Sequence, residues 1–397
     1  MRFLVFIAIA LSVLGGMHYY VWLRLVRDTG LPRGMRLALT VLLLLLLVSI
    51  PVVLFVRRQV DVATSQTMLV PFRFWLGFIV VCFVFVLGAD IARWIVILVG
   101  KLSSSGSGGA EQAADPARRV FLSRIFAGAA AGGALVSGVL SVRGAMSNVR
   151  IKRLEVTLAR LPAALDGLRI AQLSDLHIGP TLGRDWLSGI VERTNALSAD
   201  LICITGDLVD GSVSKLEKDV EPLGKLSAKQ GVYFVTGNHE YYSGAESWCR
   251  HVTSLGIKVL RNERVEIRRG DAALDLAGID DRSAFGAGHG PDIDRACAGR
   301  DASRELVLLA HQPRQIEDAV RHGVGLQLSG HTHGGQIWPW HYAVYLQQPY
   351  LKGLHARGET QIYISEGTGF WGPPLRFGST AEITEITLRA PSAKKTG

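Results

Sequence analysis

The first 150 residues contain four long apolar stretches separated by short polar segments. Each stretch approaches or exceeds the length of about 20 residues that a helix needs to cross a bilayer. They lie at 3–26, 37–56, 74–99 and 121–142. A cleaved signal peptide is an alternative for the first, but only Arg2 precedes it and further apolar stretches follow. The pattern therefore predicts a membrane region of transmembrane helices over residues 1–143.

From about Ser147 onward, short apolar runs alternate with amphipathic segments. The alternating residues Leu154, Val156 and Leu158 predict a half-buried strand. Further strands are predicted at 168–173, 201–205, 232–236, 274–279, 306–310, 326–329, 362–365 and 383–388. Helices are predicted at 184–198, 215–229, 245–255 and 313–322, and a loop at 286–294. This order indicates one α/β domain at 147–390, followed by a disordered tail at 391–397.

Charge is distributed unevenly between these two regions. The chain of 397 residues has a net charge of +9, which alone would suggest a nucleic-acid partner. Residues 1–150 carry 15 basic and 5 acidic residues, whereas residues 151–397 carry 28 and 29. The excess positive charge therefore lies beside the apolar stretches, which is typical of membrane topology signals. We expect a lipid bilayer as partner and no nucleic acid.

The segment 100–120, between the third and fourth apolar stretches, is predicted to be a flexible loop because it is rich in Ser and Gly. It leads into the residues RRVFL at 118–122, which resemble a twin-arginine export signal. Ala117 and Ser123 depart from that signal, which prefers a hydroxyl residue and Lys at these positions. The alternative is an ordinary positively charged anchor before a membrane helix.

The distribution of basic residues predicts an orientation for the chain. If the paired arginines are cytoplasmic, nine basic residues of the membrane region lie on the cytoplasmic side and six on the other. This agrees with the positive-inside rule and places the C-terminal domain outside the cytoplasm. We therefore expect a multi-pass protein of the cytoplasmic (inner) membrane. In an oxidising compartment Cys249 and Cys297 could pair, although their spacing does not require it.

Side chains that bind metals or transfer protons follow five of the predicted strands. They are Asp175 and His177, Asp207 and Asp210, Asn238, His239 and Glu240, His311, and His331 and His333. The carboxyl ends of strands in open α/β sheets form a ligand crevice, so we expect these side chains to converge. Nitrogen and oxygen donors without sulfur suit Mn, Fe, Zn or Mg. The set exceeds one tetrahedral site and predicts two divalent metal ions, which Asp207 is able to bridge.

The order and spacing of these blocks closely resemble the calcineurin-like metallophosphoesterase superfamily, whose pattern is D-x-H, G-D-x-x-D, G-N-H-[DE], H and G-H-x-H. The blocks at 174–177 and 330–336 and the tail at 367–376 are similar to its membrane-associated bacterial branch. That branch includes enzymes implicated in lipid-linked phosphate hydrolysis. The resemblance covers about 168–388 and implies an α/β sandwich of two mixed sheets after the transmembrane helices.

The resemblance also implies roles for individual residues. The implied ligands are Asp175, His177 and His333 for one metal, Asn238, His311 and His331 for the other, and Asp207 for the bridge. His239 would contact the phosphoryl group and protonate the leaving group, so His239 and Asp207 are the expected catalytic residues. The metals would bind phosphate oxygens and lower the pKa of a bridging water, which attacks as hydroxide.

Three further polar residues each have two interpretations. Asp210 either orients a metal-binding histidine or faces solvent in a turn, and Glu240 has the same two alternatives. Arg376 either binds a substrate phosphate or is an ordinary surface arginine.

Seven aromatic residues follow the paired histidines, at 338, 340, 342, 345, 350, 370 and 371. They either pack beneath long loops or line the rim of the site at the membrane interface, where Trp and Tyr are favoured. With the second interpretation, Trp338 and Trp340 would contact a substrate that carries an acyl or prenyl tail.

The sequence thus predicts a membrane-anchored dimetal phosphohydrolase acting on phosphoester or pyrophosphate bonds, with a lipid-linked substrate as the favoured hypothesis. One alternative is a tethered hydrolase of soluble phosphomonoesters or phosphodiesters. The other is a non-catalytic scaffold with the same fold. The sequence predicts no oligomeric state.

Overall fold

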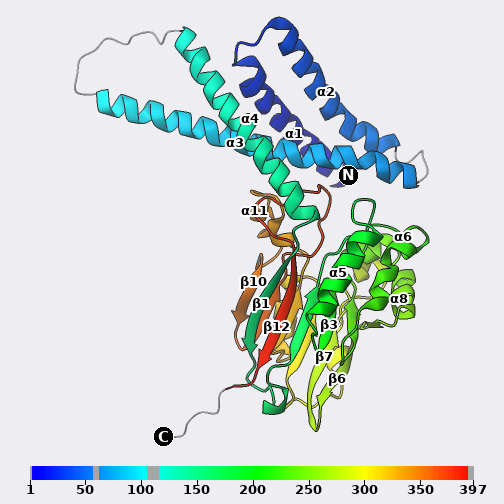
Figure 1. Cartoon of the computed structure of the whole chain (residues 1–397). Helices are drawn as coiled ribbons and strands as arrows, with labels where there is room; N and C mark the ends of the chain where they lie inside the picture. Colours follow the sequence, from blue (N-terminus) through cyan, green and yellow to red (C-terminus); the bar gives the residue numbers. More distant parts are fainter. Residues whose placement is uncertain (1, 57–61, 105–115, 392–397) are drawn as a thin grey trace. The chain divides into compact units, whose positions relative to one another are not determined.

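The computed structural model of the chain describes residues 2–56, 62–104 and 116–391 (Figure 1). These residues form two compact units, Met1–Val142 and Arg143–Gly397. The middle of the predicted flexible loop, 105–115, and the tail at 392–397 lie outside the described residues.

The N-terminal unit is helical. Its elements are α1 (Arg2–Trp22) with a π-helical turn (Leu23–Arg27), α2 (Arg33–Val56), α3 (Val62–Ser104) and α4 (Pro116–Met146). Four helices are long and apolar enough to cross a membrane. α3 extends beyond the predicted 74–99 at both ends, and α4 begins before the predicted 121, since helix formation does not stop where apolar composition ends. The paired arginines at 118–119 lie at the start of α4.

Polar side chains inside the N-terminal unit are paired with one another. Arg24, in the π-helical turn, lies with its Nε 2.7 Å from Oδ2 of Asp90 in α3. Trp75 donates a hydrogen bond from Nε1 to Nε2 of His18, over 3.0 Å. Because an unpaired charge is costly in an apolar environment, these contacts fix α3 beside the first helix.

Glycines bring α4 close to α3 within the same unit. A Cβ at Gly133 would lie 2.7 Å from the Phe85 ring, and a Cβ at Gly138 would lie 2.9 Å from the Phe78 ring. Small residues at such positions let two apolar helices approach closely. The Gly content of α4 therefore serves packing against aromatic rings.

The C-terminal unit contains two six-stranded sheets, ordered β1-β12-β2-β3-β4-β5 and β10-β11-β9-β8-β7-β6 (Figure 1). The first sheet contains β1 (Arg150–Thr157), β2 (Arg169–Leu173), β3 (Leu201–Thr205), β4 (Val232–Val235), β5 (Lys258–Val259) and β12 (Glu382–Arg389). The second contains β6 (Glu263–Arg269), β7 (Ala272–Gly278), β8 (Leu306–Leu309), β9 (Leu326–Ser329), β10 (Gly353–Arg357) and β11 (Thr360–Ile364). Both sheets combine parallel and antiparallel pairs, which confirms the expected sandwich of two mixed sheets.

Apolar side chains from both sheets form one core between them, with Leu276 of β7 and Leu328 of β9 fully buried. Three helices cover the outer face of the first sheet: α5 (Arg184–Ala196), α6 (Val213–Val220) and α8 (Ala245–Ser254). Two short helices, α9 (Ile293–Cys297) and α10 (Ile316–Arg321), cover the second. Cys249 and Cys297 belong to these different layers and both are free thiols, so the pairing that the sequence left open does not form.

The predicted strands are all present, with ends that differ by a few residues at most. The sequence missed β5, β6 and β10, which lie at the sheet edges or are very short. The exposed positions of β5 and β6 carry charged residues, and β10 mixes Gly, His and Arg with two small or apolar residues, so none of the three has the continuous apolar run of a buried strand. The predicted helix at 215–229 ends as α-helix at Val220 and continues as a 3₁₀ turn that contains Pro222. The predicted loop at 286–294 partly overlaps a 3₁₀ turn (Arg282–Ala287) and the start of α9.

Candidate metal centre

The side chains expected as metal ligands lie at the carboxyl ends of five parallel strands, three in the first sheet and two in the second. The main chain leaves each strand and delivers polar groups to one site between the ends of the two sheets. The donors are Asp175 and His177 after β2, Asp207 after β3, Asn238 after β4, His311 after β8, and His331 and His333 after β9.

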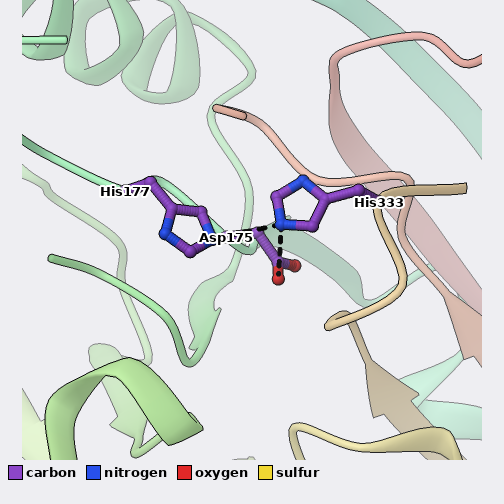
Figure 2. A group of neighbouring side chains, drawn as sticks. All are labelled: Asp175, His177 and His333. Atoms are coloured by element: carbon purple, nitrogen blue, oxygen red, sulfur yellow. Dashed lines mark hydrogen bonds and ion pairs between the residues drawn. The ribbon is translucent and has the colours of Figure 1, made fainter. Parts of the chain in front are cut away.

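One group of donors consists of Asp175, His177 and His333. Figure 2 shows their two imidazole rings and the carboxylate pointing toward one another. Nε2 of His177 lies 3.1 Å from Nε2 of His333, which lies 3.5 Å from Oδ1 of Asp175. All three residues are buried. The three side chains therefore offer two nitrogens and a carboxylate oxygen to one small volume.

A second group consists of Asp207, His311 and His331, with Asn238 beside them. Nε2 of His311 lies 3.2 Å from Oδ2 of Asp207 and 3.2 Å from Oδ1 of Asn238. Nδ1 of His331 lies 3.2 Å from the same His311 nitrogen. Oδ2 of Asp207 is also 3.7 Å from Nε2 of His177, so one carboxylate faces both groups of donors.

The hydrogen bonds of the histidine rings show which ring nitrogens have a lone pair to offer to a cation. Nδ1 of His311 lies 2.8 Å from the carbonyl oxygen of Thr205, and Nδ1 of His177 lies 2.8 Å from Oδ1 of Asp210. Because each Nδ1 faces an acceptor, it carries the hydrogen, and the Nε2 of the neutral ring has only a lone pair. These lone pairs face carboxylate oxygen or another imidazole nitrogen, an arrangement that a cation or an added proton makes favourable. The donors therefore fit divalent metal ions.

In the absence of metal, protons supply part of the positive charge that this cluster of donors favours. Burial opposes the charged form of His311, but the charge of Asp207 and its hydrogen bond raise the pKa of His311 well above its usual value. The pKa of His333 is lowered by burial and by the charge of His177, and its Nδ1 has no hydrogen-bond partner among the described residues. Metal binding must therefore displace a proton from this cluster.

Five of the donor residues have a left-handed main chain, although none is glycine. The φ angles are 53° at Asp175, 47° at His177, 53° at Asp207, 72° at His331 and 51° at His333. Such a conformation costs about 1 kcal/mol or more per residue, and it persists where the surrounding structure enforces it. At Asp175 and His177 the main-chain N–H groups donate to the carbonyl oxygens of Gly206 and Asp207, over 3.0 and 3.1 Å. The turns after β2 and β3 thus hold each other in this conformation.

Asp210 contacts two histidines of the site. Its Oδ1 lies 2.8 Å from Nδ1 of His177 and 2.7 Å from Nδ1 of His239. The side chain is largely buried, so the alternative of a solvent-facing turn residue is wrong. His239 lies edge-on to His177, with ring centroids 4.6 Å apart, and Asp210 orients both rings.

Glu240 connects two of the turns that carry donors. It lies in the first turn of α7 (Asn238–Ser243) and accepts hydrogen bonds from the main-chain N–H groups of Gly237, Asp207 and Leu208, over 2.6, 3.0 and 2.8 Å. The residue is fully buried, and its hydrogen-bond partners among the described residues are main-chain N–H groups and not a histidine ring, so neither of its two interpretations describes it. Burial and the nearby Asp207 charge raise the pKa of Glu240 to about 7.

Arg376 is only 4% exposed, so the surface-arginine alternative is wrong. Its Nη2 donates to the carbonyl oxygens of Gly367 and Gly369, and its Nη1 lies 3.4 Å from the carbonyl oxygen of His333. The guanidinium therefore holds the segment 367–376 next to a metal-site histidine. These contacts give Arg376 a structural role, and phosphate binding by it stays a prediction.

Trp338 and Trp340 are 42% and 66% exposed, so they do not pack beneath loops as the first alternative required. They lie just before α11 (His341–Val344). Among the predicted aromatic residues, Phe370 is buried against Ala145 and Leu182. Tyr350 is partly buried against the core of the second sheet, so the seven residues divide into two packed rings and five exposed ones.

Sequence reasoning missed one aromatic residue near His239. Tyr242 lies in α7 with its ring centroid 5.3 Å from that of His239. The available signal was the spacing, because residues three apart on a helix are neighbours. Trp371 also contacts the His239 ring, at 6.0 Å.

The motifs of this chain also occur in known proteins. The family model for calcineurin-like phosphoesterases matches residues 168–335. The chain is 42% identical over 272 residues to a transmembrane protein with metallophosphoesterase domain from Bos taurus, covering 64% of this chain and 61% of that protein. It is 31% identical to the uncharacterized metallophosphoesterase YkuE of Bacillus subtilis, covering 69% of this chain and 98% of that protein. It is 29% identical to an uncharacterized metallophosphoesterase of Campylobacter jejuni, covering 98% of this chain and 99% of that protein. The match therefore spans less than two thirds of the vertebrate relative.

The close approach at Gly330 leads to a first prediction. A Cβ at this position would lie 1.9 Å from Oγ of Ser174 and 2.2 Å from Oδ2 of Asp175. Gly330→Ala should displace Asp175 and weaken metal binding at least about ten-fold, although no ligand is removed. Isothermal titration with Mn²⁺ measures this effect. Gly189→Ala in α5 is the matched control, because nothing lies within 4 Å of a Cβ there; equal metal affinity in both variants would contradict the prediction.

The second prediction concerns the proton on His239 in the metal-free protein. Burial favours the neutral ring, but the hydrogen bond to Asp210 and the charges of Asp207 and Asp210 outweigh it and raise the pKa of His239 to about 9. His239 should therefore stay protonated at pH 7.5 and lose its proton as the pH rises through about 9. The pKa of a histidine in the unfolded chain is about 6.5, so below that pH the protonated His239 ring makes its full contribution to the free energy of unfolding. This contribution is lost as the pH rises through about 9.

Histidine NMR titration and urea unfolding of the metal-free protein measure these two effects. Asp210→Asn should lower the pKa of His239 and reduce the loss of unfolding free energy over the same pH range. An unchanged titration in Asp210→Asn would show that another group holds the proton.

Proposed function

The chain belongs to the calcineurin-like phosphoesterase family, and we propose that it is a membrane-anchored phosphohydrolase that holds two divalent metal ions. It would hydrolyse phosphoester or pyrophosphate bonds. The observation that carries this proposal is the convergence of nitrogen and oxygen donors from both sheets on the Asp207 carboxylate. Two groups of donors on either side of one carboxylate are the arrangement that a bridged pair of cations requires.

The two groups correspond to two metal positions. The first would be held by Asp175, His177 and His333, the second by Asn238, His311 and His331, and Asp207 would bridge them. The donor chemistry suits Mn, Fe, Zn or Mg. When bound, such ions neutralise phosphate oxygens and make a water molecule acidic enough to act as a nucleophile at neutral pH.

The remaining roles belong to side chains beside the metal ligands. The Nδ1 of His239 lies against Oδ1 of Asp210, and His239 is outside the two groups of proposed metal ligands. Its ring is therefore able to keep a proton for the leaving oxygen. Asp210 stabilises that proton and fixes the ring. Glu240 and Arg376 hold the turns that present the donors, which keeps the site rigid during turnover.

The test compares Asp207→Asn with His239→Asn in the full-length protein. Asp207→Asn removes the charge that both cations would share, so bound metal should fall and activity should drop more than about a hundred-fold. His239→Asn should keep the metal and lower kcat by about a hundred-fold or more. Elemental analysis gives metal content, and hydrolysis of nitrophenyl phosphoesters gives the rate. Wild-type metal content and turnover in Asp207→Asn would refute the assignment.

A non-catalytic scaffold is the alternative from another class. Such a protein would tolerate the loss of ligands, whereas this chain retains every donor of the family pattern in one buried cluster. The retained donors, several in strained conformations, favour a metal-loaded enzyme over a scaffold.

We further propose that the substrate is lipid-linked. Five large apolar residues are exposed around α11: Trp338, Trp340, Tyr342, Tyr345 and Leu346. Exposed Trp and Tyr are favoured at the level of lipid headgroups. Only residues 147–149 separate α4 from β1, so an apolar helix leads almost directly into this domain. A site mouth near the bilayer would suit a phosphate that bears an acyl or prenyl tail.

The substrate proposal predicts a selective effect of the two tryptophans. Trp338→Ala with Trp340→Ala should lower kcat/KM about ten-fold on a lipid phosphate in mixed micelles, and much less on a short soluble ester. Leu354→Ala, an exposed apolar change on β10, is the control. An equal change on both substrates would support the alternative of a tethered hydrolase of soluble phosphoesters.

The proposed location is the cytoplasmic membrane, with the C-terminal unit outside the cytoplasm. The support is the distribution of basic residues and the four helices able to cross a membrane. A phosphatase reporter fused after Thr396 should be active and a cytoplasmic fluorescent reporter should not. Arg118→Lys with Arg119→Lys keeps the charge, so it should block export only if the twin-arginine route is used. A cytoplasmic C-terminus would contradict the orientation.

A further inference from the structure

Two exposed aromatic rings lie against His239, and neither belongs to the metal-ligand groups. The ring centroid of Tyr242 lies 5.3 Å from that of His239, and the centroid of Trp371 lies 6.0 Å from it. Both rings are edge-on to the imidazole. They are 72% and 53% exposed, so their apolar surface is open to an incoming molecule. We call Tyr242 and Trp371 the His239 aromatic pair.

Trp371 is held in place by a buried glutamine. The side-chain Oε1 of Gln336 accepts a hydrogen bond from the main-chain N–H of Trp371, over 3.0 Å. Its Nε2 donates to the carbonyl oxygens of Trp371 and Pro373, over 2.8 and 3.0 Å. Gln336 is itself buried and has a φ of 44°, a conformation that is uncommon outside glycine. One side chain therefore satisfies both main-chain polar groups of Trp371.

The segment before Trp371 is fixed as well. Arg376 donates to the carbonyl oxygens of Gly367 and Gly369, and Phe370 is buried against Leu182. An exposed tryptophan on a segment secured from both sides loses little freedom when a ligand binds. The structure thus presents the Trp371 ring as a pre-organised surface beside His239.

The position of the pair determines which part of a substrate it would meet. The proposed reaction breaks the bond between phosphorus and the leaving oxygen; water supplies the hydroxyl group that phosphorus gains, and its other hydrogen leaves as a proton that restores the one given up by His239. The proton that His239 carries ends on the released alcohol. Atoms attached to the leaving oxygen must therefore lie close to the His239 ring, where the edges and faces of Tyr242 and Trp371 are exposed.

We propose that the His239 aromatic pair binds the leaving group, that this leaving group is apolar, and that Gln336 is the positioning residue for Trp371. This inference rests on the proposed phosphohydrolase function. It adds that the enzyme selects its substrate by the leaving group. Apolar carbon gains by covering exposed aromatic surface, whereas a small polar alcohol gains little.

The experiment uses the full-length, metal-loaded protein in detergent with ethyl, hexyl and 1-naphthyl phosphates, each as a monoester and as its methyl diester. Ethanol and hexanol are leaving groups of similar acidity, so the ratio of kcat/KM for hexyl over ethyl reports binding of the leaving group. We expect a ratio of about ten or more in the wild type. The naphthyl ester separates a planar aromatic leaving group from an aliphatic one.

Four variants test the residues. Trp371→Ala and Tyr242→Ala should each lower the hexyl-to-ethyl ratio about five-fold, mainly through KM, and Trp371→Phe should keep most of it. Gln336→Glu removes the donor to Trp371 and places a charge against its carbonyl oxygen, so it should lower the ratio like Trp371→Ala while metal content stays at the wild-type level. Phe285→Ala, which removes another exposed ring of the same unit, is the control.

The outcomes separate the inference from the function on which it rests. A ratio that is the same in the wild type, Trp371→Ala and Tyr242→Ala overturns the role of the pair, even if all three hydrolyse the esters. Loss of metal in Gln336→Glu overturns the positioning role, since it would show a general structural effect. If the metal-loaded wild type hydrolyses none of the esters, the proposed function fails and the inference fails with it.

Discussion

The carboxylate of Asp207 is the group on which the arrangement of the site depends. Its Oδ2 faces His311 at 3.2 Å and His177 at 3.7 Å, and its Oδ1 accepts the main-chain N–H of His239 at 2.8 Å. Groups that follow three different strands, β2, β4 and β8, therefore surround this one carboxylate. Burial alone would raise the pKa of such a carboxyl, but the positive charge of His311 and the hydrogen bond from it keep the pKa of Asp207 well below its usual value. A buried negative charge of this kind is stable only with cations or protons around it.

The main chain around this carboxylate leaves little room for change. A Cβ at Gly237 would lie 2.2 Å from Oδ1 of Asp207, so glycine is required where the turn after β4 passes the carboxylate. Glu240 bonds to the main chain of both turns and keeps them together. The left-handed main chain of Asp207 is restrained because Glu240 accepts its N–H, and that of Asp175 because its N–H donates to the carbonyl oxygen of Gly206. The strained main-chain conformations occur at the candidate metal ligands. Neighbouring glycines and buried carboxylates restrain the turns that carry these ligands.

The surroundings of the candidate metal centre differ from the centre itself in their exposure to solvent. All of the candidate metal ligands except the half-buried His331 are buried, whereas the rings next to His239 and around α11 are exposed. Gln336 and Arg376 are buried polar residues that secure the segment carrying Trp371. A rigid, polar centre beside an open apolar surface would be the physical basis of the proposed selection of substrates by the leaving group.

Local sequence pattern determined most of the fold and the identity of the donors. Buried strands such as β3 and β8 are almost continuous apolar runs, and the polar residues that follow them, Asp207 and His311 among them, come a few residues after the strand ends. The edge strand β6 was missed because its exposed positions carry charged residues, so its pairing with β7 is visible only in the sheet. Long apolar helices were predicted because their composition alone distinguishes them.

Only the tertiary structure decided what the polar residues outside the donor set do. Asp210 contacts two histidines, as one of its two interpretations held, whereas Glu240 bonds the main chain of two turns, which neither of its interpretations described. Arg376 and Gln336 bond to main-chain groups up to 43 residues away in sequence, which no local pattern records. A hydrogen bond depends on which main-chain groups the fold leaves unpaired nearby, and that follows from the packing of both sheets together. The sequence therefore specified the chemistry of the site, and the fold assigned the residues that hold it in place.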